Sequence, residues 1–274
     1  MTINNTKSNI VHFRPQSVQR ANFNFICGND SLAAVDKYTY LGIVINEFLD
    51  YSVTAKAVAQ SAGRALGLLI AKCKIVGGMP YDAYTKLYDS IVWPIISYGA
   101  SIWGVKSFSC INAVHNRAMR FFLGVGKYTP NDAVSGEMAW VPPIIRQWKS
   151  IVGHWSRLCN TPVSRVNKRI ALWANGKACS TYKSWFYYVN EKMLSLDLDT
   201  YTNMNGNVPK STVVSQLYDK MMSAYVNDWH DSINRPEGIR RRGRNKLRNY
   251  CKYKINYSVE NYCELIMPPK HKAA

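Results

Sequence analysis

Apolar and polar residues alternate in the first fifty positions, and this alternation predicts short β-strands. It runs through residues 9–13, 22–26 and 38–45, and the second run ends in a turn signal, Cys27-Gly28-Asn29-Asp30. A glycine inside the third run, Gly42, is typical of a bulge or a close backbone approach. Nothing else in this segment would cover the apolar faces of three short strands. We therefore expect them to depend on protein that lies upstream.

The rest of the chain carries apolar residues at helical spacing. One stripe spans residues 58–76 and stops at Gly77-Gly78-Met79-Pro80, with glycine at the helix end and proline just beyond. Residues 204–209 read as a linker between later helices. The further helices are predicted near residues 111–122, 130–138, 143–158, 166–173, 182–196 and 211–229. The fold class predicted is mainly α, with short N-terminal β-strands followed by a multi-helix bundle.

Residues 84–104 form the most apolar and aromatic block of the chain. Leu87, Ile91 and Ile95 recur in it at four-residue spacing, which predicts a core helix covered by protein on most sides. Pro94 lacks a backbone donor, so it should bend this helix or end it early. The block is long enough for a membrane span, but its charged residues and its proline argue against one.

Composition and charge narrow the class of partner. Of 274 residues, 47% are hydrophobic, which is enough for a real core and excludes a disordered tail. The formal net charge of +18 attracts polyanions, of which nucleic acid is the commonest. No basic helix has the clean apolar face of an interfacial anchor, so we expect no membrane partner. The N-terminus has no apolar run of signal-peptide length, so an intracellular location, nuclear or cytoplasmic, is predicted.

No catalytic or metal-binding motif stands out. The seven cysteines include no Cys-x-x-Cys pair, so buried reduced thiols are expected in place of a zinc or disulfide framework. None of the five histidines has a partner at the spacing of a metal pair. The chain has no phosphate-cradling G-x-x-x-x-G-K-[ST], no G-x-S-x-G elbow and no Asp-Asp dipeptide. The residues alone therefore predict no catalytic site, no metal and no cofactor.

A basic segment at residues 235–254 is the candidate for nucleic-acid binding. It has nine basic residues and one acid, Glu237, and nine minus one gives eight of the eighteen net charges. Arginine forks suit phosphate and the interleaved Tyr250 and Tyr253 offer stacking faces, although a solvated charge run or a nuclear-import patch would look the same. The residues expected to contact nucleic acid are Arg240, Arg241, Arg242, Arg244, Lys246 and Arg248.

Three stretches of the chain, taken in order, carry short motifs that together cover about half the chain, from its start to about Trp140. The first is Asn4-Asn5-Thr6-Lys7-Ser8 running into Ile10-Val11-His12-Phe13-Arg14. The second is Tyr38-Thr39-Tyr40-Leu41-Gly42-Ile43. The third includes Leu87-Tyr88, Trp93-Pro94, Ser97-Tyr98-Gly99, Trp103-Gly104, Asn116-Arg117-Ala118-Met119-Arg120-Phe121-Phe122-Leu123-Gly124-Val125, Tyr128-Thr129-Pro130 and Gly136-Glu137-Met138. In this order they resemble the region just after the catalytic motifs in reverse transcriptases of non-LTR, jockey-like retrotransposons. In that family the second stretch is similar to a primer-grip strand, and threonine is usual at the position of Ser8.

The resemblance implies an organisation into four segments. Residues 1–50 would be a palm remnant with primer-grip-like strands, and residues 51–140 a thumb-like helical domain. Residues 141–203 would be a helical extension, and residues 204–274 a linker, a long helix and the basic segment. The partners implied are an RNA template and a DNA primer, and the parent RNA-directed DNA polymerase uses Mg²⁺.

The resemblance also implies roles for single residues. Lys7 would lie near the incoming nucleotide, or be an exposed lysine before a strand. Tyr40, Leu41 and Gly42 would position the primer end, or simply pack a strand. Arg117 and Arg120, which should point away from the apolar stripe of residues 111–122, would track phosphates or solvate a helix face.

The chain departs from the family pattern in one decisive respect. The fingers, the nucleotide-binding palm and the metal-binding aspartate pair should lie before residue 1, so a truncated reading frame is expected. We expect a thumb-and-connection fragment that binds nucleic acid but does not polymerise by itself. Two alternatives stay open: a free-standing basic helical module for nucleic acid or protein, and the tail of a working polymerase whose catalytic half is encoded upstream.

Overall fold

Helices dominate the chain, which confirms the mainly α prediction with a few short N-terminal strands. The structure is a computed structural model that describes residues 4, 8–28, 30–180, 183–204, 206–234, 247 and 249–264. It divides into two compact units, residues 1–58 and residues 59–274.

The first unit contains two small β-sheets. In one, β1 (Asn9–Ile10) pairs in parallel with β3 (Asp30–Ala34), which pairs in antiparallel fashion with β2 (Phe25–Cys27). The other sheet is a hairpin of β4 (Lys37–Tyr40) and β5 (Ile43–Asn46). Strand β3 was not predicted, because aspartate and alanine are poor strand formers. The strand expected at residues 9–13 is shorter than predicted, and the strand expected at residues 22–26 is shifted toward the C-terminus.

Apolar side chains on these strands remain open to solvent. Phe23, Ile26 and Tyr40 are exposed, although each lies in or beside a strand. The turn between β2 and β3 contains Gly28 at a φ of +65°, a conformation that favours glycine, and Cys27 pairs across it with Asp30. The sequence-based expectation that this segment cannot cover its own strands is confirmed by these exposures.

Helix α1 (Ser52–Val76) ends as the sequence predicts. Its buried stripe includes Ala62, Leu66, Leu69 and Cys73. Gly77 and Gly78 follow at φ values of +83° and +136°, where residues with a side chain are strained, and they terminate the helix.

The central apolar block is four short elements in succession instead of one helix. They are α2 (Tyr81–Leu87), the π-helical turn η2 (Tyr88–Val92), α3 (Trp93–Ser97) and α4 (Ala100–Trp103). Pro94 has no N–H, and its ring crowds the carbonyl four residues earlier. The helix therefore widens into a π-helical turn just before it, where the Trp93 N–H donates to the carbonyl of Tyr88, five residues earlier. After α3, Gly99 at a φ of +61° starts α4.

The buried side of this block differs from the prediction. The residues that face the core are Tyr84, Tyr88, Val92, Ile96 and Ala100, one position beyond the predicted stripe, while Ile91 is 41% exposed. Tyrosines occupy the core because their hydroxyls have partners: Tyr84 donates to the Ala118 carbonyl at 2.9 Å, and Tyr88 bonds to His115 Nδ1 at 3.0 Å. Because Ile91 is exposed, the prediction that protein covers this block on most sides was wrong.

The remaining helices complete the second unit. They are α5 (Ser109–Leu123), α6 (Asn131–Met138), α7 (Pro143–Cys159), α8 (Val166–Gly176), α9 (Trp185–Leu194), α10 (Lys210–Asn234), α11 (Tyr250–Tyr253) and α12 (Asn261–Glu264), with a 3₁₀ turn, η3 (Asp199–Tyr201), after α9. Their local signals are conventional: Pro143 opens α7 at its first position, the Ser184 hydroxyl accepts from Tyr187 N–H at α9, and Gly124 closes α5 at a φ of +72°.

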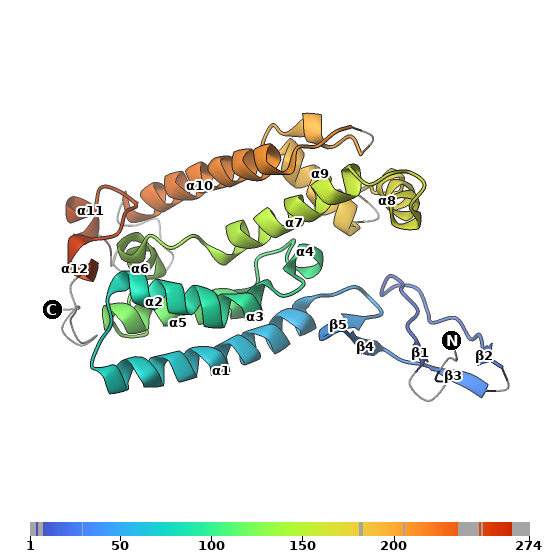
Figure 1. Ribbon diagram of the computed structural model, residues 1–274, viewed down its shortest axis with the longest axis horizontal. Coiled ribbons are helices and arrows are strands. Elements are labelled where there is room, and N and C mark those ends of the chain that lie inside the picture. The colour runs from blue at the N-terminus through green and yellow to red at the C-terminus, as the bar shows by residue number, and fades with distance from the viewer. Residues whose placement is uncertain are drawn as a thin grey trace. The chain divides into compact units, whose positions relative to one another are not determined.

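One hydrophobic core lies between α7, α9 and α10, and α10 runs beside α7 (Figure 1). Trp148, Trp155, Met193 and Leu217 are among its buried residues. The connection before α10 is held against α7, because Val208 exchanges hydrogen bonds of 2.8 and 3.0 Å with the Asn160 side chain. The segment expected as a linker is therefore packed where the structure describes it.

A second cluster joins the C-terminal helices to α6. Trp229, Ile233 and Leu247 are buried together, and Trp229 Nε1 donates to the Asp132 carbonyl at 2.7 Å. Gly136 allows this close packing, because a Cβ there would lie 2.6 Å from the Trp229 ring. Within the described part of the chain, no helix combines the length and apolar character needed to cross a membrane.

Candidate nucleic-acid interface

The three residues expected at the primer end form the tip of an exposed hairpin. Tyr40 pairs with Ile43, and Leu41 and Gly42 make the two-residue turn between β4 and β5 at φ values of +47° and +80°. Positive φ at both positions is the geometry of a type I′ turn. Tyr40 is 60% exposed and Leu41 is 70% exposed. The prediction of one continuous strand over residues 38–45 was wrong, because the chain turns back at Leu41 and Gly42. The tip presents an apolar and an aromatic side chain to solvent.

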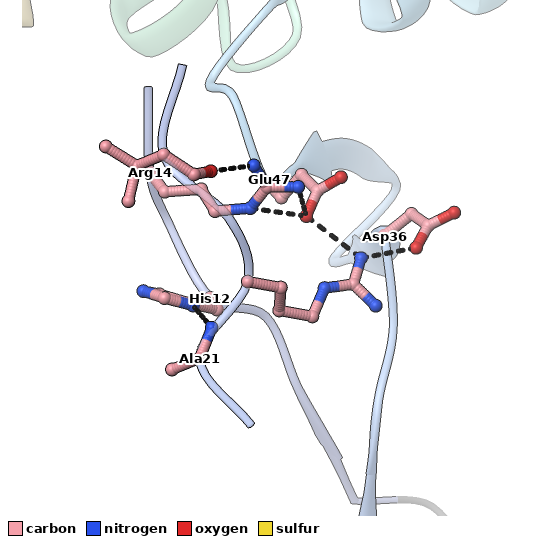
Figure 2. A network of polar contacts seen from close by, with 7 residues as sticks. His12, Arg14, Ala21, Asp36 and Glu47 are labelled. Carbon is pink, nitrogen blue, oxygen red and sulfur yellow. Dashed lines mark hydrogen bonds and ion pairs between the residues drawn. The ribbon is translucent and has the colours of Figure 1, made fainter. Parts of the chain in front are cut away.

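An ion-pair network holds the base of this hairpin (Figure 2). Glu47, directly after β5, accepts from Arg14 Nη2 at 3.1 Å and from Arg20 Nη2 at 2.9 Å. Arg20 also pairs with Asp36, just before β4, at 2.5 Å. Main-chain bonds reinforce the link, since Arg14 N–H donates to the Glu47 carbonyl and Glu47 N–H to the Asp36 carbonyl, each at 2.9 Å.

The network favours the charged forms of Arg20 and of its two carboxylate partners. Hydrogen bonding from Arg20 lowers the pKa of Glu47 and that of Asp36, and hydrogen bonding to Asp36 and Glu47 raises the pKa of Arg20. Arg14 and Arg20, the two arginines of residues 1–58, are therefore both engaged in ion pairs within the fold. Sequence reasoning missed this network because its members are 16 to 33 residues apart along the chain.

Arg117 and Arg120 lie on α5 and differ in their surroundings. Arg117 is exposed, as predicted. Arg120 is partly buried: its Nη2 donates to the Thr129 carbonyl at 2.9 Å and bonds to the Asn131 side chain, which ties α5 to the start of α6. Burial lowers the pKa of Arg120. The expectation that Arg120 points away from the fold was wrong, because the connection to α6 offers it acceptors.

The basic residues expected to bind nucleic acid lie outside the described residues. This holds for Lys7 and for Arg240, Arg241, Arg242, Arg244, Lys246 and Arg248. Two described neighbours of that segment are structural. Tyr250 packs in the C-terminal cluster and donates to the Ala133 carbonyl at 3.2 Å, and Lys254 is buried, donating to the Ser258 carbonyl at 2.7 Å and pairing with Glu260. Tyr253 is exposed and keeps a free stacking face.

Helix α1 carries a basic surface that sequence reasoning did not single out. Arg64, Lys72 and Lys74 are all exposed, and the helix contains no acidic residue. Gly63 and Gly67 lie one turn apart on it with open space where a side chain would be. Exposed cations on a helix without acidic residues attract a phosphate backbone.

A second segment, residues 138–190, also contains basic residues and no acidic ones. Residues 138–190 contain no aspartate or glutamate. They contain eight basic residues, Arg146, Lys149, Arg157, Arg165, Lys168, Arg169, Lys177 and Lys183. Most of them are exposed, whereas Lys168 is buried and Arg146 pairs with Asp89 at 2.7 Å and lies 3.7 Å from the Trp93 ring centre. The signal available in the sequence was the absence of acids, which is less conspicuous than a run of arginines.

Among the described residues, no three His, Cys, Asp or Glu side chains are grouped so that they would hold a metal ion. The hairpin tip belongs to the first unit, and Arg117 and the basic part of α1 belong to the second.

Comparison of the chain with protein-family models, with curated proteins and with solved structures finds no match.

Proposed function

We propose that this chain is the part of a non-LTR retrotransposon reverse transcriptase that holds the RNA template and the DNA primer. Two kinds of evidence support the proposal: the three stretches of family-like sequence, and a helical unit whose exposed charge is strongly positive. The observation that carries it is α1, which exposes Arg64, Lys72 and Lys74 and has no acidic residue. Contacts of this kind go to phosphates, so binding should depend little on base sequence.

The first unit has a distinct role under this proposal. Its hairpin tip, Tyr40 and Leu41, offers an apolar surface against the sugar and base of a primer end. The network around Glu47 holds the hairpin base, so the tip is presented on a braced element. The exposed apolar strands fit a segment that packs, in the working enzyme, against the remaining palm.

The competing function is a free-standing basic helical module for nucleic acid or protein, with no polymerase role. The core of residues 59–274, which closes around its own tryptophans, favours it. The two candidates differ in what they should bind best. A primer-holding part should prefer an RNA–DNA hybrid with a recessed end, whereas a general module should bind any polyanion of equal charge.

Binding of a labelled RNA–DNA primer–template, followed by fluorescence anisotropy, tests the proposal. Arg64→Gln with Lys72→Gln and Lys74→Gln should weaken binding about tenfold or more and reduce the salt slope by about three. The control is Lys210→Gln with Lys220→Gln, which removes the charges of two exposed lysines of α10 and should reduce binding less than the loss of three charges from α1. Equal binding by the α1 variant and the control would remove α1 from the interface.

Two further arms separate the alternatives. Replacing Arg240, Arg241, Arg242 and Arg244 by glutamine should also weaken binding, and unchanged affinity would remove the basic segment from the account. The pure chain with Mg²⁺ and nucleotides should not extend the primer. Extension would show that the chain polymerises unaided, contrary to the proposal. Equal affinity for heparin and for primer–template of equal charge would favour the general module.

A further inference from the structure

Helix α8 turns an apolar stripe toward solvent. Val166, Ile170 and Trp173 are 66%, 60% and 68% exposed, and their spacing of four and three residues places them on one side of the helix. Val163, in the turn just before the helix, is also exposed. A solvated helix normally places polar residues at such positions, so this face has the composition of an interface core.

The orientation of α8 is fixed by what lies beneath it. Lys168 is buried on the opposite side, and its ammonium donates to the carbonyls of Leu158 at 3.1 Å and Cys159 at 2.8 Å, and to that of Met204. These contacts use a cation to satisfy the C-terminal carbonyls of α7. Asn190 of α9 also donates to Asn175 of α8 at 2.9 Å. Rolling the helix to hide the stripe would expose this network, so the apolar face stays outward.

Charge beside the stripe indicates the kind of occupant. Arg165 and Arg169 are exposed along one flank and Lys177 lies beyond its C-terminal end. A second copy that docked through the same face would bring like charges together, because no acid occurs between residues 138 and 190. Nucleic acid is a poorer match, because only Trp173 of the three stripe residues has an aromatic face for base stacking, whereas Val166 and Ile170 have none. We propose that this face of α8 docks an amphipathic helix of a partner protein, with apolar residues on one side and acids beside them.

A synthetic peptide of about three heptads, with leucine at the apolar positions and glutamate beside them, is the probe. Its matched control is a peptide of the same composition with the order scrambled, so that charge is kept and the stripe is lost. Binding to the full chain is measured by fluorescence anisotropy. Ile170→Ser with Trp173→Ser should raise the dissociation constant about tenfold or more.

A control in α1 and two further variants at and beside α8 test whether the peptide binds specifically to the apolar face of α8. Leu68→Ser with Ile75→Ser removes two exposed apolar residues from α1 and should change peptide binding less than about threefold. Arg165→Gln with Arg169→Gln should weaken binding and its salt dependence together. Val166→Ser, a single change at the first residue of α8, is the milder variant, and thermal unfolding by circular dichroism checks that each variant folds.

Three results would overturn the proposal. The first is equal binding of the scrambled peptide, since attraction would then need only charge. The second is peptide binding that is unchanged in both the Ile170/Trp173 double variant and the Val166 variant. The third is a loss of primer–template binding in these variants while the peptide still binds, which would assign the face to nucleic acid.

Discussion

The buried histidine of α5 gives a pH-dependent prediction. His115 is 3% exposed, its Nδ1 lies 3.0 Å from the Tyr88 hydroxyl, and its ring centre is 5.4 Å from that of Trp140. Its Nε2 is buried and has no hydrogen-bond partner among the described residues. Burial lowers the pKa of His115 from 6.5 to about 3, and the charge of Arg146 acts in the same direction. The ring is therefore neutral in the folded protein.

The sign and size of the effect follow from this lowered pKa. In the unfolded chain the ring takes up a proton near its ordinary pKa of 6.5, whereas the folded chain does so only near 3. Its contribution to stability is complete above pH 6.5 and is lost as the pH falls from there toward 3. At about 1.4 kcal/mol per unit, the step from about pH 7.5 to about pH 5 should cost about 2 kcal/mol of unfolding free energy.

Urea unfolding at the two pH values, in wild type and in His115→Gln, isolates this contribution. The variant is less stable at neutral pH, but the difference between the two proteins should shrink by about 2 kcal/mol at the lower pH. An unchanged pH dependence in His115→Gln, or an NMR titration of His115 near pH 6, would refute the reasoning.

Three other substitutions test local contacts of the fold: the buried Lys168, the close packing at Gly136 and the hairpin turn at Gly42. Lys168→Met keeps the buried stem but leaves three carbonyls without a donor, so it should cost about 3 kcal/mol in urea unfolding. Gly136→Ala would place a Cβ 2.5 Å from the Tyr250 hydroxyl and should cost about 2 kcal/mol, whereas Gly126→Ala has open space and should cost much less. Gly42→Ala strains the hairpin turn at a φ of +80° by about 1 kcal/mol, and faster amide exchange in β4 and β5 should reveal it.

The helix ends were predictable where the chain itself carries the stop signal. Gly77 and Gly78 end α1 and Gly124 ends α5, because positive φ is a property that glycine brings to any context. The hairpin tip was not predictable in this way. Leucine at a φ of +47° is unfavourable, so Tyr40-Leu41-Gly42 read as a continuous strand, and the pairing of β4 with β5 overrides that preference.

The inward face of a helix was harder to predict than its length. At α8 the sequence indicates a helix of about the right span, but a pattern of apolar residues suggests that they face the core. The structure buries Lys168 instead, because three carbonyls satisfy its charge, and leaves Trp173 outside. Polar groups with tertiary partners likewise place Tyr84 and Tyr88 in the core, and their partners are 27 to 34 residues away along the chain.

The salt dependence of binding between the wild-type chain and an RNA–DNA primer–template tests the central claim most directly. Three phosphate contacts from α1 alone give a slope of about −3 for log K against log salt, and the basic segment should make it steeper. We predict tight binding at about 50 mM salt that falls steeply by about 200 mM, with little dependence on base sequence. Absence of binding at the lower salt, or an affinity that salt does not change, would contradict the account.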